Sequence, residues 1–205
     1  MYALVTDGTI TKYFNHPKGF TLGDLQYPKD IFMKWSVSEK EAIGIYEVVF
    51  DDSNKKDEQW YINTDQSFTF ANDTVTASYG TATAKAHADV TSTLDGVEYI
   101  TPGLKTNLIK DLKTNVANIL AKTDWYVTRN SEKSTAIPSA ISTHRDAVRT
   151  KQAAMEAQIT GAADTAALEI LYTYTIIENF DSLTGEQITE SVQSRPLGEL
   201  PVLES

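Results

Sequence analysis

The chain has 205 residues, of which 41% are hydrophobic, so it can bury a sizeable core as one large domain or two small ones. It contains no cysteine, which excludes disulfides, thiolate metal sites and cysteine nucleophiles. Its 28 acidic side chains outnumber the 18 basic ones, and a net charge of −10 without a basic cluster argues against nucleic-acid binding.

The first hundred residues are typical of antiparallel strands. Met1–Thr6 and Thr9–Tyr13 flank Asp7-Gly8, a dipeptide that accepts the positive φ angles of a hairpin turn. Alternating apolar side chains and β-branched residues predict further strands at Ile43–Phe50, Gln59–Asn63, Ser67–Phe70, Thr74–Thr83 and Val97–Ile100. Because Thr101-Pro102-Gly103 interrupts this pattern, we predict an antiparallel β-rich domain over residues 1–101.

One segment of this domain is rich in aromatic residues. Asn15–Lys34 mix prolines and glycines with aromatic side chains, which predicts an irregular loop held over a core. The alternative is an open aromatic platform on which sugars or bases stack. Ser38 and Glu41 have the spacing of a capping box, so a short helical turn is expected to begin there.

Residues 102–161 predict an α-helical hairpin. Apolar residues recur every three or four positions from Leu104 to Leu120, which lines one face of a helix. Tyr126–Ser139 breaks this period, and Pro138 stands where a second helix begins, because the first turn leaves its N–H position unpaired anyway. The second apolar stripe consists of Ile141, Val148, Met155 and Ile159, with Arg145, Arg149 and Glu156 outside it. Gly161 is expected to close this helix in a left-handed conformation.

The last part of the chain predicts less regular structure. Asp164 begins a short helical stretch, and Leu171–Ile177 has the composition of a strand. Gly185–Ser205 contains prolines and scattered apolar residues, which buries too little surface by itself to offset its ordering entropy. We therefore predict, for residues 162–205, a strand with an extended tail that lies along another chain or its own sheet edge. The fold class expected for the whole chain is α+β.

A group of polar and aromatic residues surrounds the link between the two predicted helices. Its members are Asp124, Trp125, Arg129, Pro138, Arg145 and Arg149. In one interpretation they form a docking surface for another protein. In the other, which we favour for Trp125, the indole completes the core at the end of an apolar helix face and Asp124 pairs with an arginine.

The same residues carry a resemblance. Asp-Trp, an Arg four residues after the Trp, Ile-Pro and then Arg-x-x-x-Arg resemble a segment of tail-associated structural and tail-fibre assembly proteins of tailed bacteriophages, marine phages especially. The resemblance covers Asp124–Arg149 and, more loosely, Tyr2–Val5 and Asp7–Ile10. It implies a virion protein of the tail, assembled in the host bacterial cytoplasm and present in several copies or as a homo-oligomer. Its partners would be other virion proteins.

Three other roles remain open. The protein can instead be a tail-fibre assembly chaperone that does not stay in the virion, or a head-decorating protein. From a different class, the ten tyrosines, three tryptophans and the aromatic segment keep a carbohydrate-binding or glycan-degrading module as an alternative.

Reactive chemistry is poorly represented. His16, His87 and His144 lack metal-ligand spacing, and the chain has neither a Gly-x-Ser-x-Gly elbow nor a glycine-rich phosphate loop. We therefore expect a non-enzymatic protein without cofactor or metal. No run of about 18 apolar residues occurs, so no membrane insertion is expected.

Overall fold

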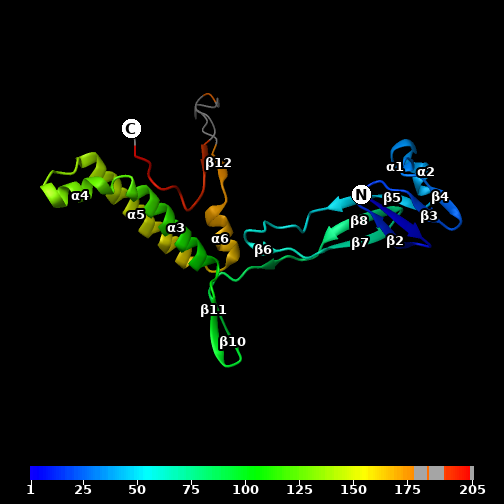
Figure 1. The fold of residues 1–205 in the computed structure, drawn as a ribbon, viewed down its shortest axis with the longest axis horizontal. Helices are drawn as coiled ribbons and strands as arrows, with labels where there is room; N and C mark the ends of the chain where they lie inside the picture. Colours follow the sequence, from blue (N-terminus) through cyan, green and yellow to red (C-terminus); the bar gives the residue numbers. More distant parts are fainter. Residues whose placement is uncertain (178–183, 185–191, 204–205) are drawn as a thin grey trace. The chain divides into compact units, whose positions relative to one another are not determined.

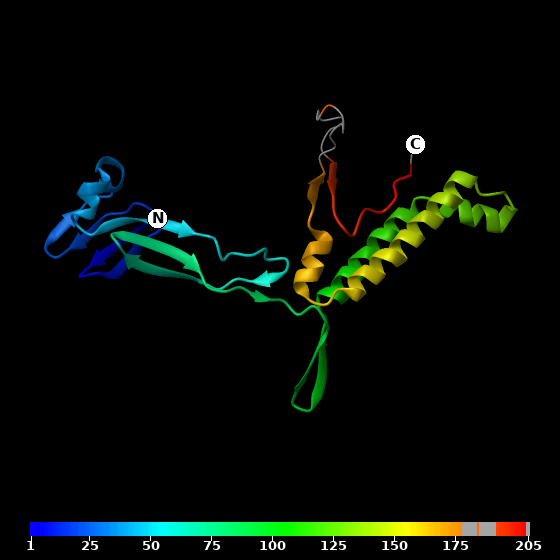
Figure 2. The same cartoon turned by 180° about the vertical axis from the view of Figure 1, so that it is seen from behind.

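The computed structural model describes residues 1–177, 184 and 192–203. The chain divides into two compact units, Met1–Thr83 and Ala84–Ser205 (Figures 1 and 2). The expected α+β class is confirmed, because a curled sheet comes first, then helices, then a C-terminal strand pair. We expected the division after Thr101, whereas the contacts place it after Thr83, so the strands of residues 90–101 belong to the second unit.

A five-stranded sheet forms the centre of the first unit. Its strands, in spatial order, are β2 (Thr9–Phe14), β1 (Tyr2–Thr6), β5 (Ile45–Asp51), β8 (Thr74–Tyr79) and β7 (Gln66–Ala71). The β1–β2 hairpin turns at Asp7 and Gly8, whose φ angles of 50° and 74° confirm the expected turn. A short pair, β6 (Tyr61–Ile62) with β9 (Thr83–Ala84), lies outside this sheet.

The sheet is mixed, which the sequence did not lead us to expect. β5 pairs with β1 in antiparallel fashion but with β8 in parallel, with Val48 opposite Val75. We predicted an antiparallel β-rich domain here, and no parallel pair was part of that prediction. Here β7 and β8 do form a hairpin, and β8 is the strand of that hairpin that pairs with β5. The chain therefore passes from β5 to β7 at the edge of the sheet before it returns to β8 between them.

Both faces of the sheet carry apolar side chains, since successive residues of a strand point to opposite faces. On one side Leu4 packs in a buried cluster with Phe14, Phe20, Ile31, Phe32 and Ile45. On the other, Ala3 and Val5 pack with Val48, Val75 and Ala77. The two outer strands approach each other, because Tyr13 on β2 and Phe68 on β7 have ring centroids 4.7 Å apart. The sheet is therefore curled.

The aromatic segment covers the first of these clusters. It is more regular than expected and contains the hairpin of β3 (Phe20–Leu22) and β4 (Leu25–Tyr27), followed by α1 (Ile31–Lys34). Phe20 lies between Phe14 and Tyr27, at ring distances of 5.0 Å and 5.2 Å. These rings pack in or against the core. They are therefore not available as the open aromatic platform that the sequence of this segment suggested.

The short helix that follows begins earlier than the sequence suggested. In α2 (Val37–Glu41) the capping box is formed by Ser36 and Glu39, whose carboxylate accepts from the Ser36 backbone N–H at 2.8 Å. We expected Ser38 and Glu41 in these roles, and that assignment is wrong by two residues. Both pairs have the right spacing, and the fold selects the first of them.

Helices make up most of the second unit. They are α3 (Leu104–Ala121), α4 (Asp124–Lys133), α5 (Ser139–Gly161) and α6 (Thr165–Tyr172). α3 and α5 pack side by side as the predicted hairpin, and their buried apolar residues are Leu112, Val116, Ile141, Val148, Met155 and Ile159 (Figures 1 and 2). The apolar stripe predicted for α5 is therefore confirmed.

Three local expectations about these helices differ from the structure. Tyr126–Ser139 was expected to be irregular, but its first half continues as helix α4. Gly161 does not adopt a left-handed conformation, since it is the last residue of α5 and Ala162 turns the chain with φ −57° and ψ 130°. Asp164 does begin a helix by accepting from Ala167 N–H at 2.8 Å, but α6 runs to Tyr172, into the segment expected as a strand.

The C-terminal segment returns to its own unit. β12 (Thr175–Ile177) pairs with β13 (Val192–Ser194), and Leu197 beyond it is only 1% exposed, with its N–H donating to Leu171 O at 3.1 Å. Gln158 on α5 donates to Pro196 O at 3.4 Å. The described part of the predicted tail thus lies along the chain's own strand and helices. Residues 185–191 and 204–205 of that prediction lie outside the described residues.

A two-stranded ribbon, β10 (Val90–Leu94) with β11 (Val97–Thr101), extends away from the helices (Figures 1 and 2). All ten of its residues are exposed. We call it the arm. The sequence predicted β11 but not β10, because residues 84–94 have no clear hydrophobic period.

Asp89 ties the root of the arm to α3. Its Oδ1 accepts from Thr106 Oγ1 at 2.6 Å and from Gly103 N–H at 2.8 Å. The hydrogen bond from Thr106, followed by that from Gly103, lowers the pKa of this carboxyl below its ordinary value of 3.8.

Acid is expected to loosen this root. A lowered folded pKa means that the ionised carboxylate stabilises the folded state, so this stabilisation is present above pH 3.8 and is lost as the pH falls through the folded pKa. Hydrogen exchange at the backbone amides of Gly103 and Leu104 should accelerate below pH 3.8, relative to other amides of α3. In Asp89→Asn this extra acid dependence should disappear; its persistence would contradict the assignment.

Candidate docking site at the end of the helical hairpin

A buried arginine holds together the end of the hairpin. Arg145 on α5 is 8% exposed, and its Nη1 donates to Leu120 O at 2.8 Å and to Thr123 Oγ1 at 2.6 Å. Its Nη2 lies 2.8 Å from Asp124 Oδ1. One guanidinium group therefore connects the end of α3, the link after it and the first residue of α4. Charge-assisted hydrogen bonds of this kind are stronger than neutral ones.

The pairing of Asp124 with an arginine is thus confirmed, but the exposed position expected for Arg145 is wrong. Position 145 comes four residues after Ile141 and three before Val148, so it belongs to the buried stripe of α5 by spacing alone. The sequence carried that signal, but a charged residue is normally assigned to the solvent side. The carbonyl, hydroxyl and carboxylate oxygens around the guanidinium allow it to be buried here.

On α4, the exposed ring of Trp125 stacks on the half-buried side chain of Arg129. The Arg129 guanidinium carbon lies 4.6 Å from the centroid of the Trp125 ring and 5.5 Å from that of Tyr126. Trp125 is 52% exposed, so the expectation that it completes the core is wrong. The physical reason is that the chain breaks at Thr123 and starts a new helix, none of whose residues is buried. Trp125 is thereby carried past the end of the α3 stripe.

The remaining motif residues take simpler positions. Pro138 immediately precedes α5 with φ −53°, close to the helix start expected for it. Arg149 is half exposed and lies 3.5 Å from Asp146 on its own helix, a surface pair of little energetic weight. The structure brings Asp124, Trp125, Arg129 and Arg145 to the α4 end of the hairpin. Arg149 belongs to the exposed side of α5.

Two residues at this site escaped the sequence analysis. Thr123 is 3% exposed. Its hydroxyl donates to Leu120 O at 3.0 Å and accepts from Arg145. Tyr126 contributes the second ring of the stack, 3.9 Å from Trp125 between centroids. A Thr directly before an acidic residue is typical of a helix start, and this signal could have located both Thr123 and α4.

The charge of Arg129 is not paired with a carboxylate. No ion pair of Arg129 occurs within the part of the chain that the structure describes, and its buried Nε has no hydrogen-bond partner there. Tryptophan and arginine are the residue types that contribute most to protein interfaces. The arrangement therefore suits a protein partner that covers the indole and supplies a carboxylate to Arg129.

Removing the indole should have little effect on stability. Because Trp125 packs mainly on Tyr126 and Arg129 at the surface, Trp125→Ala is expected to lower the free energy of unfolding by less than about 1 kcal/mol. Urea unfolding followed by circular dichroism would measure this change, with Val127→Ala on the same helix as the matched control. A loss of about 3 kcal/mol or more, as is usual for a buried tryptophan, would contradict the exposed placement.

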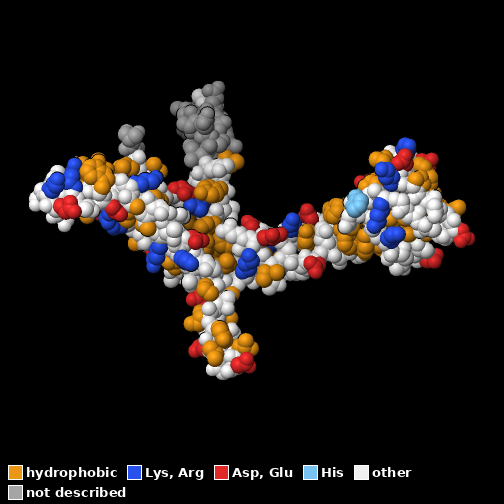
Figure 3. Space-filling model, viewed as in Figure 1, with side chains coloured by type: hydrophobic (Ala, Val, Ile, Leu, Met, Phe, Trp, Pro, Cys, Tyr) orange, Lys and Arg blue, Asp and Glu red, His pale blue; other side chains and the backbone are white. Residues whose placement is uncertain are grey.

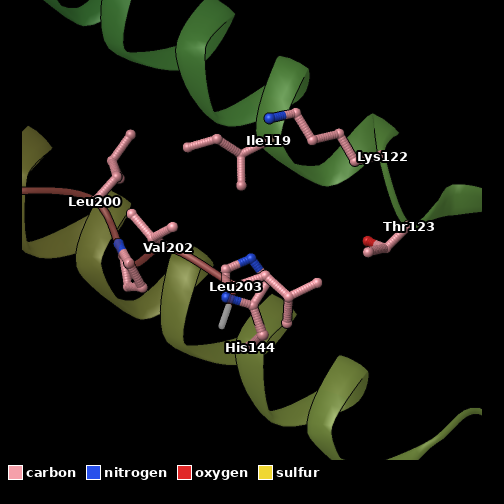
Figure 4. A pocket seen from close by; sticks show the side chains of 8 residues that line it. Ile119, Lys122, Thr123, His144, Leu200, Val202 and Leu203 are labelled. Carbon is pink, nitrogen blue, oxygen red and sulfur yellow. The ribbon is translucent and has the colours of Figure 1, made fainter. Parts of the chain in front are cut away.

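A pocket of about 300 Å³ lies next to this site (Figure 4). Its lining residues are Ile119 of α3, Lys122 and Thr123 directly after that helix, His144 of α5 and the C-terminal residues Leu200–Leu203. Most of its surface is apolar, and none of these lining residues is a carboxylate, so it lacks the pair of acids that glycoside hydrolysis uses. The pocket lies beside the hydrogen bonds of Arg145, because Thr123 lines the pocket and also accepts from that guanidinium group.

Among the described residues, no group of three or more histidine, aspartate or glutamate side chains is placed to hold a metal ion. None of the helices that the structure describes is long and apolar enough to cross a membrane.

The chain was also compared with known proteins. Comparison with protein-family models, curated proteins and solved structures finds no match.

Proposed function

We propose that this protein is a structural component of a bacteriophage virion, associated with the tail, and that it acts by binding other virion proteins without catalysing a reaction. The proposal rests on the resemblance of Asp124–Arg149 to tail-associated proteins. The observation that carries it is the exposed ring of Trp125 stacked on Arg129, held on a helix that buried Arg145 fixes in place.

The geometry supports binding for a physical reason. A partner gains most from contacts that are ordered before it arrives, because less conformational entropy is then lost on association. Arg145 attaches the first residue of α4 to α3 and α5, and Arg129 is already stacked over two rings. The site is thus preorganised, and its two largest side chains are of the types that act as interface anchors.

The chemistry of the site is consistent with an inert role. Among the described residues that line the pocket beside it, Lys122 and His144 alone have titratable side chains. The aromatic residues that motivated a glycan-binding module are largely used in the core of the first unit. These observations favour a protein ligand over a sugar.

Purified virions provide the test. If the proposal holds, mass spectrometry of purified particles detects the protein, and imaging locates it in the tail. Trp125→Ala should lower its amount per particle by about tenfold or more, as expected for an interface anchor worth at least about 2 kcal/mol. Arg149→Ala, an exposed residue of the same motif, should leave it unchanged.

Three outcomes would overturn the proposal. A protein that is absent from particles but needed to produce them is an assembly chaperone. One that is found on the capsid is a head-decorating protein. Normal incorporation of a folded Trp125→Ala variant would show that the stack is not the contact that retains the protein.

A further inference from the structure

We propose that the arm, β10 with β11, docks onto the exposed face of α3 in a second copy of this chain. The inference does not depend on the proposed function, because it concerns association of the protein with itself. It rests on the exposure of the arm, on its fixed root, and on a surface of matching length and opposite charge on α3.

The arm has an apolar face that no described residue covers. Directly opposed residues of an antiparallel pair point to the same side. The register therefore places Val90, Ser92, Leu94, Val97, Tyr99 and Thr101 on one face. Leu94 is 65% exposed and Val97 and Tyr99 about half exposed. An isolated two-stranded ribbon is marginally stable in water, so a second surface is needed to hold it.

The arm is also acidic. Residues 90–101 contain Asp95 at the turn and Glu98 on β11, but no lysine or arginine. Figure 3 shows hydrophobic side chains along the projecting arm with acidic ones near its end. Glu98, opposite Thr93, lies on the other face, so the carboxylate that borders the apolar face is that of Asp95. A matching partner surface is therefore apolar with a basic side chain near the turn of the arm.

The root of the arm prevents it from folding back on its own helix. Backbone N–H groups of Leu104 and Lys105 donate to Ala86 O and His87 O at 2.9 Å and 3.0 Å, and Asp89 accepts from Gly103 and Thr106. The arm extends away from α3 in Figures 1 and 2. Its apolar face is thus available to another molecule and not to the helix that follows it.

The exposed face of α3 has the complementary chemistry. A shallow groove of about 550 Å³ runs along it, with Ile109, Thr114 and Ala117 among its lining residues and Lys110 and Lys113 at its side. Lys110 makes no ion pair among the residues that the structure describes, and Lys113 lies 3.7 Å from Glu156, a long contact. The lysines therefore remain able to attract Asp95, which lies at the turn next to Leu94 and Val97 of an incoming arm.

The dimensions agree as well. The groove runs from Thr106 to Ala117, which is about 18 Å along a helix axis at about 1.5 Å per residue. The five residues of β10 span about 17 Å at about 3.4 Å per residue. An arm laid along α3 would cover the groove from end to end.

This contact joins two different surfaces, so each copy donates one arm and accepts another. Such heterologous contacts form rings when the rotation closes and filaments when it does not. One arm buries little surface, so a single contact is weak. A closed ring or a repeated array gains strength from many linked contacts.

Disulfide crosslinking tests the proposal directly, because the chain has no cysteine of its own. Leu94→Cys on the arm is mixed with a size-tagged Thr114→Cys protein, whose cysteine lies in the groove. Under mild oxidation the mixed dimer should form at least about tenfold faster than with a size-tagged Val127→Cys protein, whose exposed cysteine lies on α4. Circular dichroism confirms that each variant is folded.

Charge reversal supplies the second half of the experiment. Lys110→Glu in the groove protein should slow crosslinking by about tenfold, since like charges would then meet. With an Asp95→Asn arm protein, which lacks the carboxylate at the turn and keeps a residue that tolerates positive φ, Lys110→Glu should slow crosslinking much less. Equal rates at Thr114→Cys and Val127→Cys, or no slowing by Lys110→Glu, would overturn the proposal. Neither result bears on the presence of the protein in virions.

Discussion

Replacing Arg145 with alanine is expected to lower the free energy of unfolding of the helical unit by about 3 kcal/mol. The variant loses hydrogen bonds to Leu120 O and Thr123 and the ion pair with Asp124. It also leaves a cavity where the buried aliphatic part of the side chain packed. The loss stays moderate because the Asp124 side chain is 60% exposed and can be hydrated once its partner is gone. Urea unfolding followed by helical circular dichroism measures the change.

Arg149→Ala is the matched control, since it removes the same side chain one helical turn away. Its contact with Asp146 is long and solvated, so a change within about 0.5 kcal/mol is expected. Arg145→Lys separates charge from geometry. A single ammonium group cannot reproduce the planar fork that reaches three oxygens, so most of the loss should remain. Equal effects for Arg145→Ala and Arg149→Ala would contradict the buried contacts.

Gly103→Ala is expected to cost about 3 kcal/mol, the upper end of the usual effect of forcing an extra methyl group into a packed site. A Cβ atom at this position would overlap the backbone carbonyl group of Ala88. Relief requires residue 103 to move apart from residue 88, which weakens the neighbouring bonds from Leu104 and Lys105 that hold the arm root. Hydrogen exchange at these two amides should rise together with the loss of stability.

Gly161→Ala provides the comparison for this variant. It lies in the last turn of α5 with open space around it, and its φ angle is not positive. Alanine is the better helix former, so a gain of about 0.5 kcal/mol is expected. If the two substitutions had similar effects, the close approach of residues 88 and 103 would be refuted.

Local sequence patterns were sufficient for some of the regular parts of this chain. The stripe on α5 and the Asp7-Gly8 hairpin follow from residues close together in sequence, and both are present. In each case the pattern reports a surface that must be buried or a turn that needs positive φ angles. Such local requirements are written in the sequence itself.

Local sequence patterns could not predict features that depend on residues far apart in the chain. α4 has no apolar stripe, and its first residue is held by Arg145, which belongs to a different helix further along the chain. The parallel pairing of β5 with β8 depends on the placement of a whole hairpin. For the docking site, the sequence identified the residues but reversed the environments of Trp125 and Arg145. Burial there is decided by where α3 stops, which periodicity locates only to within a few residues.

The parallel contact between β5 and β8 also has a consequence for the order in which the first unit assembles. The β1–β2 and β7–β8 hairpins close over short turns and can form within microseconds. The β5–β8 and β1–β5 pairs must instead wait for longer loops to close, which is slower and costs more entropy. Refolding should therefore be limited by the meeting of two preformed hairpins at β5.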